Sequence, residues 1–234
     1  MFVLSGMKSK VVRGGVGALA WAATLAGATG VALHFSRWSS QLVVLAASGA
    51  PYLMGSALVG LLPHRYLSPG RTAAGTGIWS AYPLSDTVEY DGFVLNQLSA
   101  TATVPGVGPV TLYALHPVPP VYSAAVWADE LSRLREILDR SPADRPVIAG
   151  GDFNATHDHA QFRAMVSGRF GAAAEQAGAG RLVTYPTDKR WPPLVGIDHI
   201  LVAGGRAVSV ETTDLPGADH RALVARILLD RGEH

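Results

Sequence analysis

The chain has 234 residues, a formal net charge of +1, 48% hydrophobic residues and 16% charged residues. The charged share lies well below the roughly 25% that is typical of soluble domains. This composition excludes an intrinsically disordered chain, which would be poor in apolar residues and rich in charge. Because the chain has no cysteine, disulfides, zinc–thiolate sites and cysteine nucleophiles are excluded as well.

Charge is distributed unevenly along the chain. Residues 1–85 carry six basic residues and no carboxylate, since the first acidic residue is Asp86. Residues 86–234 carry the other 13 basic and all 18 acidic residues, a net charge of −5. A third of the chain without a carboxylate is unusual for a surface that faces water. Because the net charge of residues 86–234 is negative, a long nucleic acid, which binds along a basic track, is disfavoured as the substrate.

Two apolar segments dominate the N-terminal third. Gly14–Leu33 has no charged residue over 20 positions, which as a helix crosses the roughly 30 Å hydrocarbon core of a bilayer. Trp38–Leu62 is a second uncharged run of 25 residues, with Pro51 as the site of a kink. We therefore predict a membrane region over residues 1–62, with two transmembrane helices at about 14–33 and 38–62. A cleaved signal peptide, a buried strand and core helices of a soluble domain are the alternatives.

Basic residues beside these segments predict their orientation. Lys8, Lys10 and Arg13 precede the first segment, and Arg65 and Arg71 follow the second. By the positive-inside rule, the N-terminus and the part after the second span lie on the cytoplasmic side. The charge difference is small and leaves the opposite orientation open.

From residue 63 onward, short apolar segments alternate with Gly, Pro and Asp breaks, a pattern typical of β-strands. Helices are expected from Ser123 to Arg140, where apolar residues recur along one face, and from about Asp158 to Val166. We predict that residues 63–234 form an α/β domain, a sheet sandwich with outer helices. The expected strands are Gly77–Ser80, Phe93–Thr103, Val110–Leu115, Val147–Ala149, Ile197–Val202, Val208–Thr213 and Leu223–Leu228, with a hairpin-type connection over Val104–Pro109.

The first segment that suggests chemistry is VIAGGDFN, residues 147–154. A buried strand is expected to end at its two glycines and to present Asp152 and Asn154. Because Asp152 and Asn154 are two residues apart on an extended segment, their side chains project to the same face. Together they can hold a metal or a water and donate an amide hydrogen bond to an anionic oxygen. An ordinary Asx turn is the alternative.

Two Asp-His pairs and one further histidine follow the expected strands. Asp219 and His220 combine a metal-ligating carboxylate with an imidazole that can act as a general base. At Asp198 and His199, strand alternation sends the side chains to opposite faces. We expect Asp198 to orient an imidazole and His199 to be structural. Each pair alone can be incidental.

His116 ends a further expected strand and is followed by three prolines in HPVPP. Proline restricts the backbone, so this histidine is expected on a stiff loop that fixes its direction. A histidine on an ordinary surface loop is the alternative.

In this order, the segments resemble the endonuclease/exonuclease/phosphatase superfamily, which includes deoxyribonuclease I, the abasic-site endonucleases and the neutral sphingomyelinases. The resemblance runs from about residue 61 to 229. It rests on His116, GGDFN, IDHI, ADHR and GTGIWSAYPL, the last being similar to a family strand that ends in a Ser-x-Tyr-Pro turn. The apolar N-terminus resembles bacterial members with membrane helices ahead of the domain, which implies a multi-pass protein of the bacterial plasma membrane.

The resemblance implies a fold and a reaction. The fold is a four-layer α/β/β/α sandwich, here preceded by the two transmembrane helices. The reaction is hydrolysis of phosphodiesters or phosphomonoesters with Mg²⁺, or alternatively Mn²⁺. The implied substrates are a lipid head group, a nucleic acid or a small phosphate ester, and a membrane anchor favours lipid head groups or extracellular nucleic acid. No protein partner can be inferred.

The resemblance also assigns roles. His220 becomes the general base or a phosphate contact, oriented by Asp198, and Asp152 positions or activates the attacking water. The phosphoryl oxygens are bound by Asn154 and His116, and His116 can also assist the leaving group. The implied metal ligand is Asp219.

One departure from the family pattern puts activity in doubt. The family has an Asn at the end of its first strand and a Glu that is the principal Mg²⁺ ligand, and both belong to its N-terminal part. Here the first carboxylate is Asp86 and the asparagines are Asn96 and Asn154. We therefore expect a domain that is incomplete on its N-terminal side and binds Mg²⁺ weakly. Three hypotheses follow: a membrane-anchored phosphoesterase, a catalytically impaired remnant that acts as a membrane or binding protein, and a membrane protein whose C-terminal motifs are coincidental.

Overall fold

The computed structural model describes residues 3–4, 62–70 and 74–230. The chain divides into two compact units. One contains residues 66–78 and 83–234 together with residues 1–2, and the other contains residues 3–65 and 79–82. The helices and the six-stranded sheet described below belong to the first unit, which also carries the segments that suggested chemistry.

A six-stranded mixed sheet is the centre of the first unit, with the order β4-β5-β6-β7-β9-β8. Strand β6 pairs with β7 in parallel, and every other neighbouring pair in this sheet is antiparallel. The turn between β5 and β6 is closed by a 3.1 Å hydrogen bond from Val107 N to Val104 O, at the predicted hairpin connection. The strands are β4 (Leu84–Tyr90), β5 (Gln97–Val104), β6 (Gly108–Leu115), β7 (Val147–Asp152), β8 (Gly171–Ala172) and β9 (Asp198–Ala203).

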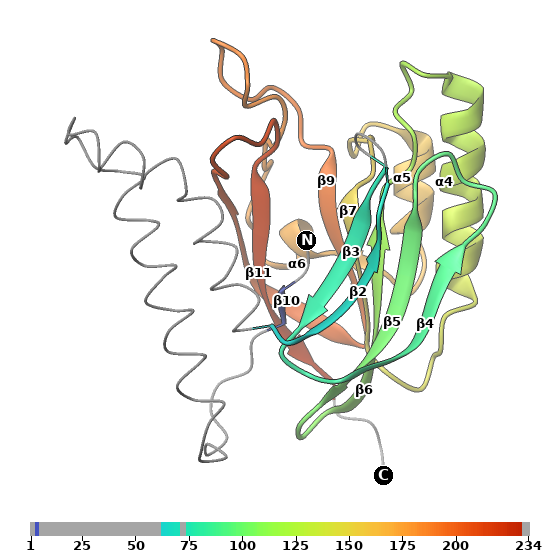
Figure 1. Ribbon diagram of the computed structural model, residues 1–234. Coiled ribbons are helices and arrows are strands. Elements are labelled where there is room, and N and C mark those ends of the chain that lie inside the picture. Colours follow the sequence, from blue (N-terminus) through green and yellow to red (C-terminus); the bar gives the residue numbers. More distant parts are fainter. Residues whose placement is uncertain (1–2, 5–61, 71–73, 231–234) are drawn as a thin grey trace, which may run out of the picture. The chain divides into compact units, whose positions relative to one another are not determined.

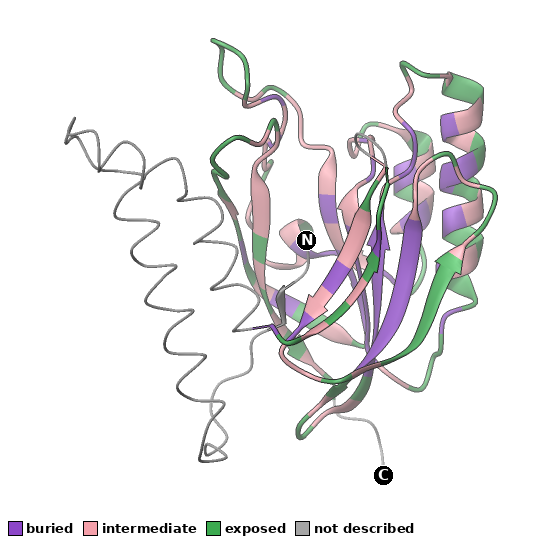
Figure 2. Cartoon of the chain, in the orientation of Figure 1, coloured by how far each residue is buried: buried purple, intermediate pink, exposed green. Residues whose placement is uncertain are grey.

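The middle strands are covered on both faces. Along β6, Tyr113 and Leu115 join the core beneath the helices, while Leu112 and Ala114 face the other side and are also buried. Figure 2 shows β5 buried along most of its length and the edge strand β4 exposed. Burial on both faces explains why β6 has a nearly continuous apolar sequence instead of an alternating one.

Helix α4 (Ala124–Asp139) covers one face of this sheet together with α5 (Ala160–Met165), as Figure 1 shows. Ser123 is the N-cap of α4, and its hydroxyl accepts a hydrogen bond from Val126 N at 3.3 Å. The predicted helix from Ser123 to Arg140 is confirmed, and its buried apolar face consists of Trp127, Leu131, Leu134 and Leu138.

The other face of β9 packs against a hairpin of β10 (Gly205–Thr213) and β11 (Ala222–Leu229) and against the short helix α6 (Ala173–Gln176). Ala173, Val202, Ala207 and Val210 form the buried core of this contact. The mixed α/β class with a sheet-rich core is therefore confirmed.

A three-stranded sheet has the order β1-β3-β2. It consists of β1 (Val3–Leu4), β2 (His64–Ser68) and β3 (Thr76–Ser80). Strand β1 pairs in parallel with the end of β3, with Val3 opposite Trp79.

Strand β4 was not among the expected strands, and the predicted strand Phe93–Thr103 begins only at Gln97. The five inner residues of β4 are exposed, so its sequence lacks the apolar alternation of a half-buried strand. Phe93 belongs to the preceding loop, where the Arg133 guanidinium lies 4.3 Å from its ring centroid. The pattern therefore misplaced the start of β5, because an apolar loop residue continues the run of a buried strand.

The predicted transmembrane helices at 14–33 and 38–62 lie outside the described residues, apart from Leu62. Among the helices that the structure describes, none is long and apolar enough to cross a membrane.

Replacing Leu131 by alanine should lower the free energy of unfolding by about 2–5 kcal/mol, because a fully buried leucine side chain is deleted between α4 and the sheet. Urea denaturation followed by circular dichroism measures this change. Ser132→Ala, one position along on the exposed side of α4, is the matched control, with an expected change within about 0.5 kcal/mol. Equal denaturation midpoints for the two variants would contradict the described packing of α4.

Candidate active site

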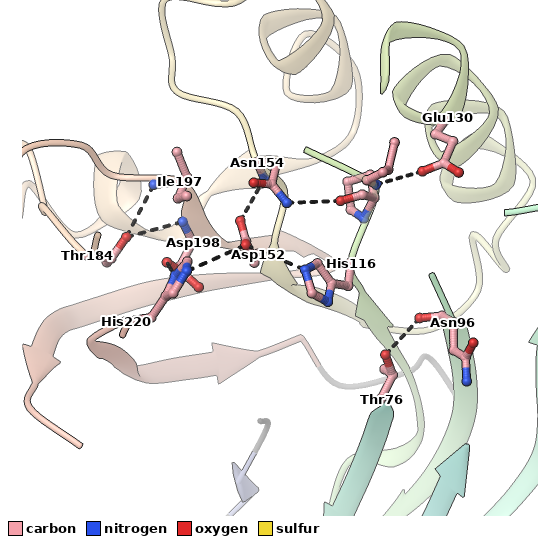
Figure 3. Close-up of polar contacts among 12 residues, drawn as sticks. Thr76, Asn96, His116, Glu130, Asp152, Asn154, Thr184, Ile197, Asp198 and His220 are labelled. Carbon is pink, nitrogen blue, oxygen red and sulfur yellow. Dashed lines mark hydrogen bonds and ion pairs between the residues drawn. The ribbon is translucent and has the colours of Figure 1, made fainter. Parts of the chain in front are cut away.

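The ends of three neighbouring strands bring the polar side chains together. In the parallel β6–β7 pair, Leu115 lies opposite Gly151, so the next residues, His116 and Asp152, lie side by side at the ends of the two strands. In the antiparallel β7–β9 pair, Asp152 lies directly opposite Asp198. Figure 3 shows His116 and His220 on the two sides of Asp152.

Asp198 and His199 point to opposite faces of β9, as strand alternation predicts. The His199 ring is buried, and its Nε2 lies 2.7 Å from Ala155 O. It also contacts Phe162, with ring centroids 4.0 Å apart. Burial lowers the pKa of His199 to about 4, so this histidine is a neutral core residue at physiological pH.

Asp198 orients His220. The Asp198 Oδ2 atom lies 2.8 Å from His220 Nδ1, and the ring of Tyr185 packs over the imidazole at a centroid distance of 4.7 Å. Burial disfavours protonation of His220, but the hydrogen bond and charge of Asp198, with the charges of Asp152 and Asp219, outweigh it and raise its pKa. His220 is thus held with Nε2 directed toward Asp152, and the carboxylates around it raise its pKa.

Asp152 is the centre of the cluster. Its Oδ2 atom lies 3.6 Å from His116 Nε2 and 3.8 Å from His220 Nε2, and its Oδ1 atom accepts a 2.7 Å hydrogen bond from Asn154 N. Only 16% of the side chain is exposed. Burial and then the charge of Asp198 raise the pKa of Asp152 to about 7. A carboxyl group with this pKa can both accept and release a proton near neutral pH.

Asn154 ties the loop after β7 to the loop after β6. Its backbone has a positive φ of 49°, a conformation that asparagine tolerates better than most residues. Its side-chain Nδ2 donates a 3.0 Å hydrogen bond to Pro117 O, next to His116. One amide hydrogen is therefore engaged in the protein, and the second is available for another acceptor.

Gly151 allows the two strand ends to approach. Its φ is +147°, and a Cβ atom at this position would lie 1.9 Å from the carbonyl oxygen of Leu115. No other residue fits there without separating β6 from β7. The second glycine of GGDFN is thus a requirement of the spacing between His116 and Asp152.

A divalent cation fits the chemistry of this cluster. Ligand atoms of Asp152, Asp198 and His220 all lie within 4.8 Å of one another. Asp219, the ligand expected from the sequence, is not part of this group. Asp219 is exposed, and its backbone carbonyl accepts a hydrogen bond from Thr187 N at 2.8 Å. Its charge nevertheless contributes to the pKa of both Asp152 and His220.

No glutamate joins the group within the part of the chain that the structure describes. Glu130 is buried and accepts hydrogen bonds from Val94 N and Val118 N, and Glu89 accepts one from Ser68 Oγ. Neither carboxylate is therefore placed to complete the metal ligands.

Two contributors near Asp198 and His220 were not anticipated. Thr184 is fully buried, and its hydroxyl accepts from the backbone N–H of Ile197 at 3.2 Å and of Asp198 at 3.4 Å. Its neighbour Tyr185 covers His220. Both lie on an irregular segment whose contacts span more than ten residues, so no local pattern in the sequence could have indicated them.

Asp152→Asn should stabilise the metal-free protein at pH 8 but not at pH 4. The pKa of about 7 in the folded state exceeds the ordinary value, so the unfolded state releases this proton first as pH rises. Folding stability then falls between about pH 4 and pH 7, and the substitution removes this penalty of about 1–4 kcal/mol. Urea unfolding in a chelating buffer measures it. Asp139→Asn, on the exposed side of α4, is the control; an effect of Asp152→Asn that does not change with pH would contradict the buried carboxyl.

Comparison with known proteins identifies the family. The sequence matches the endonuclease/exonuclease/phosphatase family over residues 19–220, a match that begins well before residue 61, where the resemblance was expected to start. No curated protein sequence matches the chain.

Solved structures share the fold. An endonuclease/exonuclease/phosphatase from Beutenbergia cavernae superposes with a TM-score of 0.60 at 18% identity, covering 78% of this chain and 57% of that one. D. rerio TDP2 complexed with single-strand DNA product gives 0.62 at 16% identity, over 77% and 81%. An endonuclease/exonuclease/phosphatase from Bacteroides vulgatus gives 0.57 at 17% identity, over 76% and 81%. The chain thus spans little more than half of the Beutenbergia protein. Since the family match covers most of this sequence, the chain belongs to the endonuclease/exonuclease/phosphatase family.

Proposed function

We propose that the protein is a membrane-anchored, Mg²⁺-dependent phosphoesterase that hydrolyses phosphodiester or phosphomonoester bonds. The observation that carries this proposal is the largely buried Asp152 carboxyl between two imidazoles, with Asp198 orienting one of them. Hydrolysis of a phosphoester needs a proton acceptor for water and cationic or hydrogen-bonding groups for the phosphoryl oxygens. This cluster contains both kinds of group within one site.

Asp152 is the proposed acceptor of the water proton. Its pKa of about 7 gives a substantial ionised fraction at neutral pH and enough basicity to take a proton as the water attacks phosphorus. The Asn154 N–H holds Oδ1, which leaves Oδ2 directed toward the two histidines. The carboxylate therefore meets the water from a fixed direction.

His220 and His116 are the proposed phosphate contacts. Of the two roles expected for His220, its raised pKa favours the phosphate contact, with the imidazolium Nε2–H donating to a phosphoryl oxygen. Asp198 keeps the ring oriented through Nδ1. His116, on the opposite side of Asp152, binds a second oxygen and donates a proton to the leaving group, and the second amide hydrogen of Asn154 supports the same charge.

Mg²⁺, or Mn²⁺ in its place, would be held by the Asp219 carboxylate, next to His220 in the sequence. Mg²⁺ commonly binds to one or two protein carboxylates and retains waters, so this donor set is adequate without being strong. When bound, the ion supplies charge neutralisation for the phosphoryl oxygens.

The substrate class follows from the anchor. The apolar segments at 14–33 and 38–62 would hold the domain at a bacterial plasma membrane, which favours a phosphoester in a lipid head group. A nucleic acid is the second substrate class: D. rerio TDP2, a structural neighbour, was solved with a single-strand DNA product. The net charge of −5 over residues 86–234 argues against a long strand.

An impaired remnant that acts as a membrane or binding protein is the second candidate function. It is favoured by one observation: among the described residues, no glutamate stands beside Asp152, Asp198 and His220.

We expect weak Mg²⁺-dependent hydrolysis of bis(p-nitrophenyl) phosphate, rising only at millimolar Mg²⁺. His220→Gln should reduce kcat by about 100-fold or more, since a charged contact to the phosphoryl group is lost. Asp219→Ala should raise the Mg²⁺ requirement by about 10–100-fold, with Asp139→Ala as the control. No turnover with Mg²⁺ or Mn²⁺ would refute the phosphoesterase. Strong turnover at sub-millimolar Mg²⁺ that disappears in Asp219→Ala would instead show that a further residue completes the site.

The full-length chain should sediment with membranes and resist extraction by alkaline carbonate, because two uncharged segments of 20 and 25 residues bury their apolar side chains in lipid. Fractionation of expressing bacterial cells, followed by immunoblotting, measures this. Substituting two arginines into 14–33 should release part of the protein. Recovery of the unmodified chain in the soluble fraction would contradict the anchor.

A further inference from the structure

The backbone of the loop that carries His116 is held by side chains instead of by a regular turn. Gln97 makes two hydrogen bonds to the backbone of His116. Its Oε1 accepts from His116 N at 2.7 Å, and its Nε2 donates to His116 O at 2.7 Å. The loop continues through Pro117 to Val118. Glu130 Oε2 accepts from Val118 N at 2.7 Å, and Asn154 Nδ2 donates to Pro117 O at 3.0 Å. Figure 3 shows the contacts of Asn154 and Glu130 to this loop.

The sequence of the loop explains why side chains are needed. Pro117, Pro119 and Pro120 have no N–H, so residues 116–118 have few backbone donors. The first backbone turn of the loop, with Tyr122 N donating to Pro119 O at 2.9 Å, comes only after them. The β5–β6 ladder ends with Leu98 opposite Ala114. The carboxamide of Gln97 presents an acceptor and a donor to His116, as a neighbouring peptide group in a sheet would.

The burial of Gln97 and Glu130 indicates that these hydrogen bonds stabilise the loop. Gln97 is fully buried and Glu130 is 1% exposed. A buried carboxamide or carboxylate costs free energy unless its hydrogen bonds are made. Gln97 Nε2 also donates to Leu95 O at 3.0 Å, and Glu130 Oε1 accepts from Val94 N at 2.7 Å. Both side chains are satisfied, and each joins the His116 loop to the segment before β5.

We propose that Gln97 and Glu130 are positioning residues for the reaction assigned above: they hold the His116 loop so that Nε2 stays 3.6 Å from Asp152. Neither residue contacts the reacting atoms. They act through His116, whose displacement by about 1 Å is enough to lower turnover by up to about 100-fold. This role rests on the proposed phosphoesterase, but the hydrogen bonds themselves can be tested without activity.

Gln97→Met keeps the side-chain length and removes both hydrogen bonds to His116. We expect kcat to fall by about tenfold or more, with KM changed by less than about twofold, because alignment is lost and the remaining phosphate contacts are kept. Amide hydrogen exchange at His116 N–H should accelerate by about tenfold, and exchange at Leu112 N–H should not change. Thr101→Val is the matched control, a buried change on the same face of β5 that is remote from the loop.

Unchanged kcat in a folded Gln97→Met protein, or equal losses in Thr101→Val, would overturn the positioning role. If Gln97→Met does not fold, Glu130→Gln and the wild-type protein still decide the question. In the wild type, the side-chain amide protons of Gln97 must exchange slowly; fast exchange would refute the contacts. In the Glu130→Gln variant, amide exchange at Val118 N–H should accelerate. An unchanged exchange rate would refute the positioning role of Glu130.

The two proposals fail separately. Absence of turnover in the wild type, with slow exchange at His116 N–H and at the Gln97 amide, would refute the phosphoesterase and leave the loop contacts intact. Turnover in the wild type that is insensitive to Gln97→Met would refute the positioning role alone.

Discussion

Strands β6 and β7 run parallel and end at the same edge of the six-stranded sheet, and the candidate site depends on this pairing. His116 and Asp152 are 36 residues apart in the sequence, and only the register of Leu115 with Gly151 makes them neighbours. The antiparallel partner β9 then adds Asp198 directly opposite Asp152. The loop before β11 has to bring only His220 to a pair of carboxylates that the sheet has already placed. The register of these three strands therefore determines the geometry of the polar cluster.

Placing two carboxylates on neighbouring strands has an electrostatic consequence. Asp198 raises the pKa of Asp152 through its charge and raises the pKa of His220 through its hydrogen bond. One partly buried carboxylate thus raises the pKa of two groups in the same cluster. His199, one residue along β9, is buried on the opposite face with its pKa lowered to about 4. Alternation along one strand thus places adjacent residues in the polar cluster and in the core.

Local patterns in the sequence were sufficient for much of this arrangement. The apolar face of α4 and the opposite directions of Asp198 and His199 follow from periodicity, and the hairpin at Val104–Pro109 follows from its turn residues, because each depends on a few neighbouring residues. The edge strand β4 was missed because its exposed side chains leave no apolar pattern. Gln97 and Glu130 were missed for another reason. The partner of Gln97 lies 19 residues later in the chain and that of Glu130 lies 12 residues earlier, and buried polar contacts of this kind have no periodic signal.

Gly151 connects the packing of the core with the spacing of the polar cluster. The clash that a Cβ atom would make with the Leu115 carbonyl falls on the last residue pair of the β6–β7 ladder, and the Leu115 side chain itself belongs to the hydrophobic core. A larger residue at position 151 would therefore disturb the packing of the core and the spacing between His116 and Asp152 together. Loss of turnover in a Gly151→Ala protein would thus not by itself identify a residue that takes part in the chemistry.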